Sequence, residues 1–235
     1  MPSKAIAPVV LLAMLVILVP TASASIIGTL DVEGNGVVVS ATTIDWLPIG
    51  GGTGLISTTT ISDLTYDSGT PLGVSDGSIM DLTSPTAFPV LDFMTFVGAP
   101  GLSFNLAGLG PGSSDFNCAG LTSGQSCSIA PGSPFILTKI GNTTAVILTA
   151  FGTATDSMGD MSTWSGLFTA QLPNLTPAQV QANFAKNPEY SIEDSYSGTF
   201  VATPVSTPES STSTMALAGL GLLVLARIPF RRRRV

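Results

Sequence analysis

The stretch Phe135–Thr155, FILTKIGNTTAVILTAFGTAT, decides the fold class. It holds two runs rich in apolar and β-branched residues, Phe135–Ile140 and Ala145–Thr155, on either side of the turn pair Gly141-Asn142. Runs of this length and composition, bounded by turn residues, are typical of β-strands. We therefore interpret the stretch as two strands joined by a turn.

The same pattern recurs over residues 25–206. Eight further runs are interpreted as strands: Ile26–Glu33, Gly36–Trp46, Gly54–Leu64, Ile79–Leu82, Val90–Val97, Leu102–Leu106, Thr163–Leu172 and Tyr190–Ala202. Turn signals lie between them at Gly34-Asn35-Gly36, Gly50-Gly51-Gly52, Asp76-Gly77 and Asp156–Asp160. Many short strands at close spacing predict an all-β domain, and we expect a jelly-roll-like β-sandwich over residues 25–203.

One segment has the pattern of a helix. Thr176 can cap it, Pro177 suits its first position, and Gln179 completes a capping box. We predict a short loop helix from Pro177 to Lys186, ended by Asn187-Pro188. We expect it to close one end of the sandwich, and the alternative is a lid over a binding site.

Charge is distributed unevenly along the chain. Residues 25–206 hold two lysines against fourteen carboxylates, a net charge of −12. Such a domain repels phosphate backbones, so we expect no nucleic-acid partner. The chain has no histidine, the most frequent general base and transition-metal ligand. We therefore expect no enzymatic activity, no cofactor and no metal.

The N-terminus has the three-part layout of a secretory signal peptide. Lys4 supplies the positive charge, Ala5–Val19 is apolar, and Ala22-Ser23-Ala24 is a small-residue cleavage site. The apolar run is shorter than the ~20 residues that span a bilayer, so we prefer a cleaved signal over residues 1–24 to a retained anchor. The partner would be signal peptidase.

The C-terminus, residues 204–235, has a second short apolar segment. We predict a membrane helix over about residues 214–230, followed by arginines that remain in the cytoplasm by the positive-inside rule. The apolar residues of this anchor are Met215, Leu217, Leu220, Leu222, Leu223, Val224 and Leu225, and the basic residues are Arg227, Arg231, Arg232, Arg233 and Arg234.

This tail resembles a known sorting signal. Thr207-Pro208-Glu209, a Ser/Thr spacer, a short apolar helix and terminal arginines together resemble the PEP-CTERM signal of Gram-negative-type bacteria. The family's signal carries a Pro-Glu-Pro motif, whose first two positions match Pro208 and Glu209, whereas the third is Ser210. The resemblance implies that an exosortase, a membrane-embedded protease or transpeptidase, cuts the tail. An ordinary membrane tail anchor is the alternative.

Cys118 and Cys127 are the chain's two cysteines. An even pair in an exported chain predicts a disulfide. The pattern Phe116-Asn117-Cys118, then Cys127, then Gly132–Leu137 also resembles exported PEP-CTERM proteins of acidobacterial type, a likeness that implies membership but no activity.

Three residue groups could carry chemistry. Asp31–Gly36 imitates the start of an EF-hand loop, but position 12 would be Thr42 instead of glutamate, so we favour a β-hairpin turn. Asp156–Asp160 with Glu193 and Asp194 could supply a glycosidase carboxylate pair. An aromatic platform for sugars could form from Trp46, Tyr66, Trp164, Tyr190 and Tyr196.

The sequence thus predicts an exported cell-surface or matrix protein that is transiently anchored in the inner membrane and sorted by an exosortase. A structural role in an exopolysaccharide or biofilm is the first hypothesis. A surface-displayed carbohydrate-binding module is the second, and a glycosidase-like enzyme is the third.

Overall fold

The computed structural model describes residues 25–40, 43–48, 52–187 and 190–205. The stretch 135–155 forms the antiparallel strands β11 (Phe135–Ile140) and β12 (Thr143–Thr155). Their register pairs Ile140 with Thr143 across the two-residue turn Gly141-Asn142, where Gly141 has φ +59°. Glycine adopts this left-handed conformation without steric cost, which explains why the turn forms here. The predicted pair of strands is confirmed.

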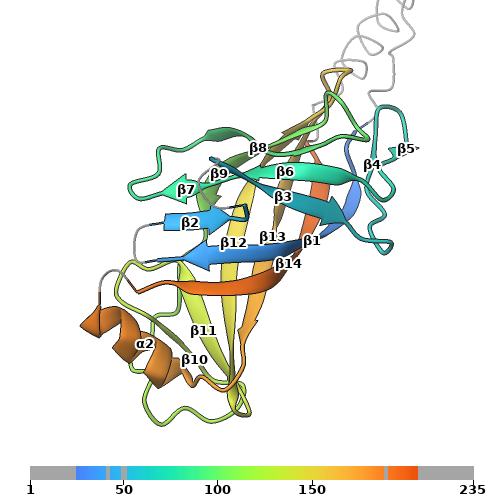
Figure 1. Ribbon diagram of the computed structural model, residues 1–235. Helices are drawn as coiled ribbons and strands as arrows, with labels where there is room; N and C mark the ends of the chain where they lie inside the picture. The colour runs from blue at the N-terminus through green and yellow to red at the C-terminus, as the bar shows by residue number, and fades with distance from the viewer. Residues whose placement is uncertain (1–24, 41–42, 49–51, 188–189, 206–235) are drawn as a thin grey trace, which may run out of the picture. The chain divides into compact units, whose positions relative to one another are not determined.

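Eight strands form a closed antiparallel barrel (Figure 1). In hydrogen-bonded order they are β12, β13 (Met161–Leu172), β14 (Ile192–Pro204), β1 (Gly28–Val39), β3 (Thr53–Thr58), β6 (Asp76–Met80), β8 (Val90–Phe96) and β9 (Ser103–Leu109). The pairing of β9 with β12 closes the ring. All eight strands overlap runs that the sequence predicted.

The predicted jelly-roll-like sandwich is wrong, because the sheet closes on itself. One edge of β12 is shared by two partners: Thr143–Leu148 pairs with β11, and Ala150–Thr155 pairs with β9. Inward and outward residues alternate in the same way in a barrel and in a sandwich. The alternation in the sequence therefore predicted strands but could not distinguish the two architectures.

The closing seam depends on a glycine and a tryptophan. The β9–β12 register shifts between Phe151 and Gly152, and a Cβ on Gly152 would overlap the carbonyl oxygen of Asn105. The Trp164 indole N–H donates to the carbonyl oxygens of Asn105 on β9 and Thr153 on β12, at 3.1 and 3.2 Å. The buried indole thus satisfies carbonyls at the point where the strand pairing is irregular.

Aromatic rings fill the barrel. Trp164 packs edge-on against Phe200 with ring centroids 5.4 Å apart, and Trp46 lies 4.6 Å from Tyr196. Phe168 contacts Phe200 at 4.8 Å. An eight-stranded barrel is just wide enough for side chains to fill it, and here the fill is largely aromatic.

Residues 31–36 do not form the predicted hairpin turn. β1 runs through them and pairs with β14 on both sides of a register shift between Gly34 and Val37. A Cβ on Gly34 would overlap the ring of Tyr196, so this glycine admits a core side chain instead of reversing the chain. Asp76-Gly77, also expected in a turn, begins β6.

Shorter elements lie outside the ring. β2 (Thr43–Trp46) pairs with β1 and with β7 (Leu82–Thr83), and β10 (Ser126–Ser128) pairs with β11. β4 (Thr65–Tyr66) and β5 (Thr70–Pro71) form a separate two-stranded sheet. The sequence had not predicted β4, β5 and β10 as strands.

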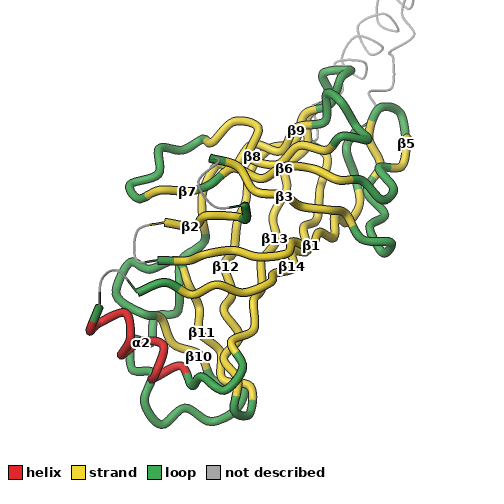
Figure 2. The backbone as a smooth tube through the Cα atoms, viewed as in Figure 1, coloured by secondary structure: helices red, strands yellow, loops and turns green. Residues whose placement is uncertain are grey.

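The predicted helix is confirmed as α2 (Pro177–Lys186), with Thr176 and Gln179 forming the capping box. Figure 2 shows α2 beside the end of the sheet where β10 and β11 extend from the barrel. Val180 and Phe184 of α2 pack into a second apolar cluster with Leu137, Leu172 and the cysteines. The predicted disulfide is also confirmed, joining Cys118 and Cys127 with Cα atoms 5.3 Å apart.

Among the described residues, no helix has the length and apolarity to cross a membrane. The predicted signal segment 1–24 and the sorting tail from residue 206 lie outside the described residues. Their cleavage, anchoring and sorting therefore stay predictions.

Gly152→Ala should weaken the closing seam. The added methyl group overlaps the Asn105 carbonyl, and overpacking of this kind costs about 1–3 kcal/mol of unfolding free energy. Urea denaturation followed by tryptophan fluorescence measures the change. The control is Thr153→Ala at the next position, whose side chain points out of the barrel and should matter less. Equal losses in the two variants would contradict a specific role for Gly152.

Candidate binding cleft

The predicted carboxylate pair is not assembled. Pro204, at one end of β14, pairs with Ser162, six residues after Asp156, whereas Glu193 near the other end pairs with Val38. Ten residues of strand separate Asp194 from Pro204, roughly 30 Å at about 3.3 Å per residue. Glycosidase carboxylates lie ~5–10 Å apart, so these groups cannot act together on one bond.

Asp156 has a structural role instead. Its buried carboxylate accepts hydrogen bonds from the backbone N–H groups of Asp160, Met158 and Asp67, at 2.9, 3.1 and 3.1 Å. These bonds hold the β12–β13 turn and fix the β4–β5 turn against it. Capping of this kind is the usual role of aspartate in turns.

The predicted aromatic platform is not assembled either. Trp46, Tyr66, Trp164 and Tyr196 are buried in the main core. Tyr190 packs edge-on against Phe184 of α2, with ring centroids 5.1 Å apart. Burial raises the pKa of the Tyr196 phenol well above its usual range, as expected for a ring enclosed in the barrel. The four buried rings stabilise the core and cannot stack on a sugar at the surface, and the half-buried Tyr190 packs on the helix instead of beside them.

A cleft of about 1300 Å³ lies at one end of the domain, and sequence reasoning did not identify it. Its walls are formed by the β1–β2 connection, the β7–β8 loop, the segment after β9, the β10–β11 turn and one side of α2. These segments lie at the α2 end of the barrel (Figure 1). We refer to this hollow as the helix-end cleft.

The lining of the helix-end cleft is uncharged. None of its described lining residues is Asp, Glu, Lys or Arg. Phe88 and Phe116 expose 42% and 44% of their surface, and Pro111, Pro131 and Pro134 add further apolar area. Hydroxyl-bearing side chains from seven positions also line it: Ser40, Thr43, Ser84, Thr86, Ser113, Ser114 and Ser133. The cleft thus offers apolar rings and neutral hydrogen-bonding groups.

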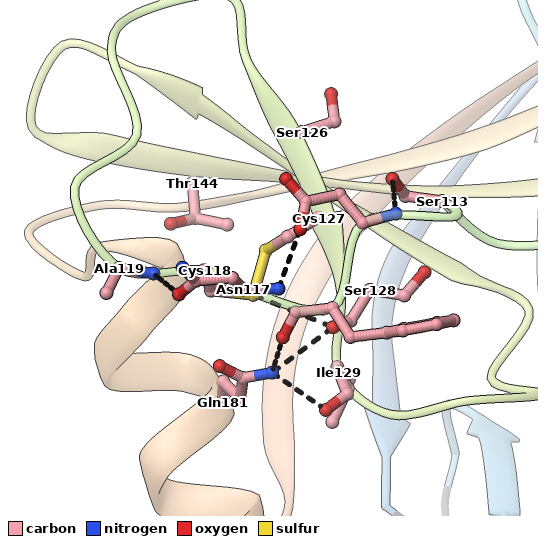
Figure 3. The surroundings of a disulfide bond; sticks show 12 residues. Ser113, Asn117, Cys118, Ala119, Ser126, Cys127, Ser128, Ile129, Thr144 and Gln181 are labelled. Carbon is pink, nitrogen blue, oxygen red and sulfur yellow. Dashed lines mark hydrogen bonds between the residues drawn. A yellow bond between two sulfur atoms is a disulfide. The ribbon is translucent and has the colours of Figure 1, made fainter.

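The wall that carries Phe116 is held by the disulfide and by one glutamine (Figure 3). Gln181 Nε2 on α2 is within hydrogen-bonding distance of the carbonyl oxygens of Phe116, Ile129 and Ser128, at 2.9, 3.1 and 3.3 Å. Two residues after Phe116, Cys118 is bonded to Cys127 on β10. The Phe116 backbone is therefore tied both to the helix and to the sheet extension.

Side-chain caps hold the same segment from within. The Asp115 carboxylate accepts from the Asn117 backbone N–H at 2.8 Å, and the Asn117 side-chain oxygen accepts from the Ala119 backbone N–H at 3.1 Å. The Asp115 carbonyl accepts from the Ser128 N–H at 2.8 Å. Successive turns of this kind restrict the backbone, so the Phe116 ring projects from a defined loop.

A second, smaller groove crosses the β1 bulge. It has a volume of about 850 Å³, and Glu33, Asp76 and Asp194 are among its lining residues. Within the described part of the chain, no group of three or more potential ligands is arranged to hold a metal ion. The Asp31–Gly36 segment, compared above with an EF-hand loop, lies in strand β1 beside this groove.

Asp45 and Asp81 place two carboxylates close together near the β2–β7 pairing. Asp81 accepts from the Trp46 backbone N–H at 2.8 Å, while the buried Oδ1 of Asp45 has no hydrogen-bond partner among the described residues. Burial raises the pKa of the Asp81 carboxyl above its ordinary value, and repulsion from Asp45 makes a smaller contribution in the same direction.

Comparison with models of protein families, with curated proteins and with solved structures finds no match to this chain. Its function must therefore be argued from its own residues.

Asp81→Asn should change the pH dependence of stability. A carboxyl whose pKa is raised on folding adds stability below its unfolded pKa and loses that contribution as pH rises through its folded pKa. The variant should thus be more stable than the parent at pH 7, and the difference should shrink toward pH 3. Thermal unfolding across this range measures it, with the exposed Glu193→Gln as control. A difference that grows on acidification would contradict the assignment.

Replacing both cysteines should weaken the wall of the helix-end cleft. Loop-entropy reasoning for nine residues of separation gives a loss of about 2–3 kcal/mol in unfolding free energy for Cys118→Ser with Cys127→Ser. Denaturant unfolding with and without a reducing agent measures it. The parent should lose stability on reduction and the double variant should not. If the reducing agent leaves the unfolding free energy of the parent unchanged, the disulfide contributes little to stability.

Proposed function

We propose that the chain is an exported surface or matrix protein that acts by binding rather than by catalysis. An N-terminal signal would deliver it across the inner membrane. A C-terminal tail of the PEP-CTERM type would hold it there until an exosortase cuts near Thr207-Pro208-Glu209. An exopolysaccharide or a related matrix would be its surroundings.

The Cys118–Cys127 disulfide is the observation that carries this proposal. Disulfides form and persist in oxidising compartments and are rare where the cytosolic thiol pool is reduced. The two cysteines also lie in the second apolar cluster together with α2, so the bridge is part of the folded domain. A domain built in this way suits a location outside the cytoplasm.

The paired strands β1 and β14 place Gly28 and Ala202 at the end opposite the helix-end cleft. Gly28, at the start of β1, pairs with Ala202 near the end of β14. The helix-end cleft lies beyond the opposite ends of these strands, where Val39 pairs with Ile192. The cleft is therefore at the far end of the β1–β14 pair from Gly28 and Ala202.

Binding is favoured over catalysis by the chemistry of the cleft. Its described lining has no carboxylate, lysine or free thiol, and the chain has no histidine. General acid–base catalysis needs a titratable group within hydrogen-bond reach of the substrate. A glycosidase built on the carboxylates considered above is also ruled out by their separation along β14. The carbohydrate-binding role stays as the second candidate, because the cleft offers exposed rings and hydroxyl groups.

Intact mass of the protein recovered from an exosortase-bearing bacterium tests the sorting proposal. The expected mass lacks residues 1–24 and the arginine-rich tail, and it is lower by two hydrogen atoms because of the disulfide. Pro208→Ala with Glu209→Ala should leave the tail uncut while the signal is still removed.

Ser210→Ala is the matched control, because Ser210 occupies the position where the family's motif has proline. It should be processed like the parent. A tail retained in the parent would reduce the sorting to simple anchoring. Full-length chain in the cytosol with free thiols would overturn export altogether.

A further inference from the structure

We infer that the helix-end cleft binds an uncharged polysaccharide, with the rings of Phe88 and Phe116 packing against sugar faces. This inference rests on the binding role proposed above and names its site and ligand class. It does not depend on how the chain is sorted.

Exposed phenylalanine is uncommon in this domain and is concentrated at the cleft. Of the described phenylalanines, three are exposed: Phe88 at 42%, Phe116 at 44% and Phe151 at 46%. Two of the three line the cleft, and they come from the β7–β8 loop and the segment just before Cys118, far apart in sequence. The remaining phenylalanines described are buried in the two apolar clusters. Burial of an aromatic ring is strongly favourable, so rings kept exposed at one hollow suggest a ligand that covers them.

The residues that line the cleft complement the two kinds of surface that a sugar has. A pyranose has apolar C–H faces that pack on aromatic rings and hydroxyl edges that exchange hydrogen bonds with neutral groups. Ser84 and Ser114 are exposed residues of the lining, close in sequence to Phe88 and Phe116. Their hydroxyls can therefore reach a ligand in the cleft.

Charge selects against acidic polymers. An anionic polysaccharide needs lysine or arginine to compensate its carboxylates or sulfates. Residues 25–206 have two lysines. Lys139 donates through Nζ to the Leu121 carbonyl at 2.7 Å, and Lys186 is not among the lining residues of the cleft. The fourteen carboxylates of the same region repel an anionic chain.

Size and wall type favour a polymer of sugars over other neutral ligands. The volume of about 1300 Å³ exceeds the ~300–1000 Å³ that is usual for small-molecule pockets. A peptide that binds by strand addition recruits a free strand edge for its backbone hydrogen bonds. The cleft walls are mostly loops and one helix.

Affinity electrophoresis of the full chain tests the inference. The gels contain a neutral polysaccharide (laminarin, mannan, xylan or dextran) or an anionic one (polygalacturonate or alginate). At least one neutral polymer should retard the parent, and neither anionic polymer should. Phe88→Ala and Phe116→Ala should each weaken the retardation at least tenfold in apparent Kd.

Phe151→Ala is the matched control, since it removes a similarly exposed ring from β12 that is not among the residues lining the cleft. It should bind like the parent, and thermal unfolding checks that all variants are folded. The inference is overturned if no neutral polymer retards the parent, or if the cleft variants bind as the parent does. It is also overturned if an apolar or proline-rich peptide binds through Phe88 and Phe116 while the glycans do not. Normal processing in the mass experiment, together with failure here, would reject the cleft assignment alone.

Discussion

The closure of the β9–β12 seam is the constraint on which the rest of the molecule depends. Without it, β9 and the second half of β12 would be two open edges, and the aromatic interior would face water. Gly152 permits the backbones to approach, and the Trp164 indole satisfies the Asn105 and Thr153 carbonyls there. One buried side chain therefore fills the core and also stabilises the irregular pairing that encloses it.

Closure also determines where the helix-end cleft can form. Because β9 pairs with only the second half of β12, the first half is left to β11, and β11 with β10 extends beyond the ring. The extension has an apolar face that the barrel does not cover. α2 and the disulfide loop cover it and form the second cluster. The cleft lies between this added layer and the β1–β2 and β7–β8 connections, so it is a consequence of a long strand divided between two partners.

Local signals in the sequence were sufficient for local structure. The capping residues of α2, the Gly141-Asn142 turn and the cysteine pair each act within about ten residues, and all three predictions were confirmed. Local signals could not predict that the sheet closes into a barrel, because closure depends on contacts such as that of Trp164 with Asn105, 59 residues apart. The prediction of a turn at Gly34 was wrong for the same reason. The absence of a side chain at Gly34 makes room for the ring of Tyr196, a residue distant in sequence. The cleft was missed because five separated segments build it.

The distribution of charge connects the architecture with the proposed role. A domain with fourteen carboxylates over residues 25–206 would be expected to place some of them in a cleft of this size, yet the described lining of the helix-end cleft has none. Asp115 is adjacent to Phe116 in sequence, but its carboxylate caps the Asn117 backbone N–H. The Asp156 carboxylate likewise accepts hydrogen bonds from backbone N–H groups in a turn at the other end of the barrel. These two carboxylates stabilise turns, while the cleft has a neutral lining that includes aromatic rings and hydroxyl groups. An unpartnered carboxylate in this lining would weaken the case for a neutral ligand, because desolvating it would oppose binding.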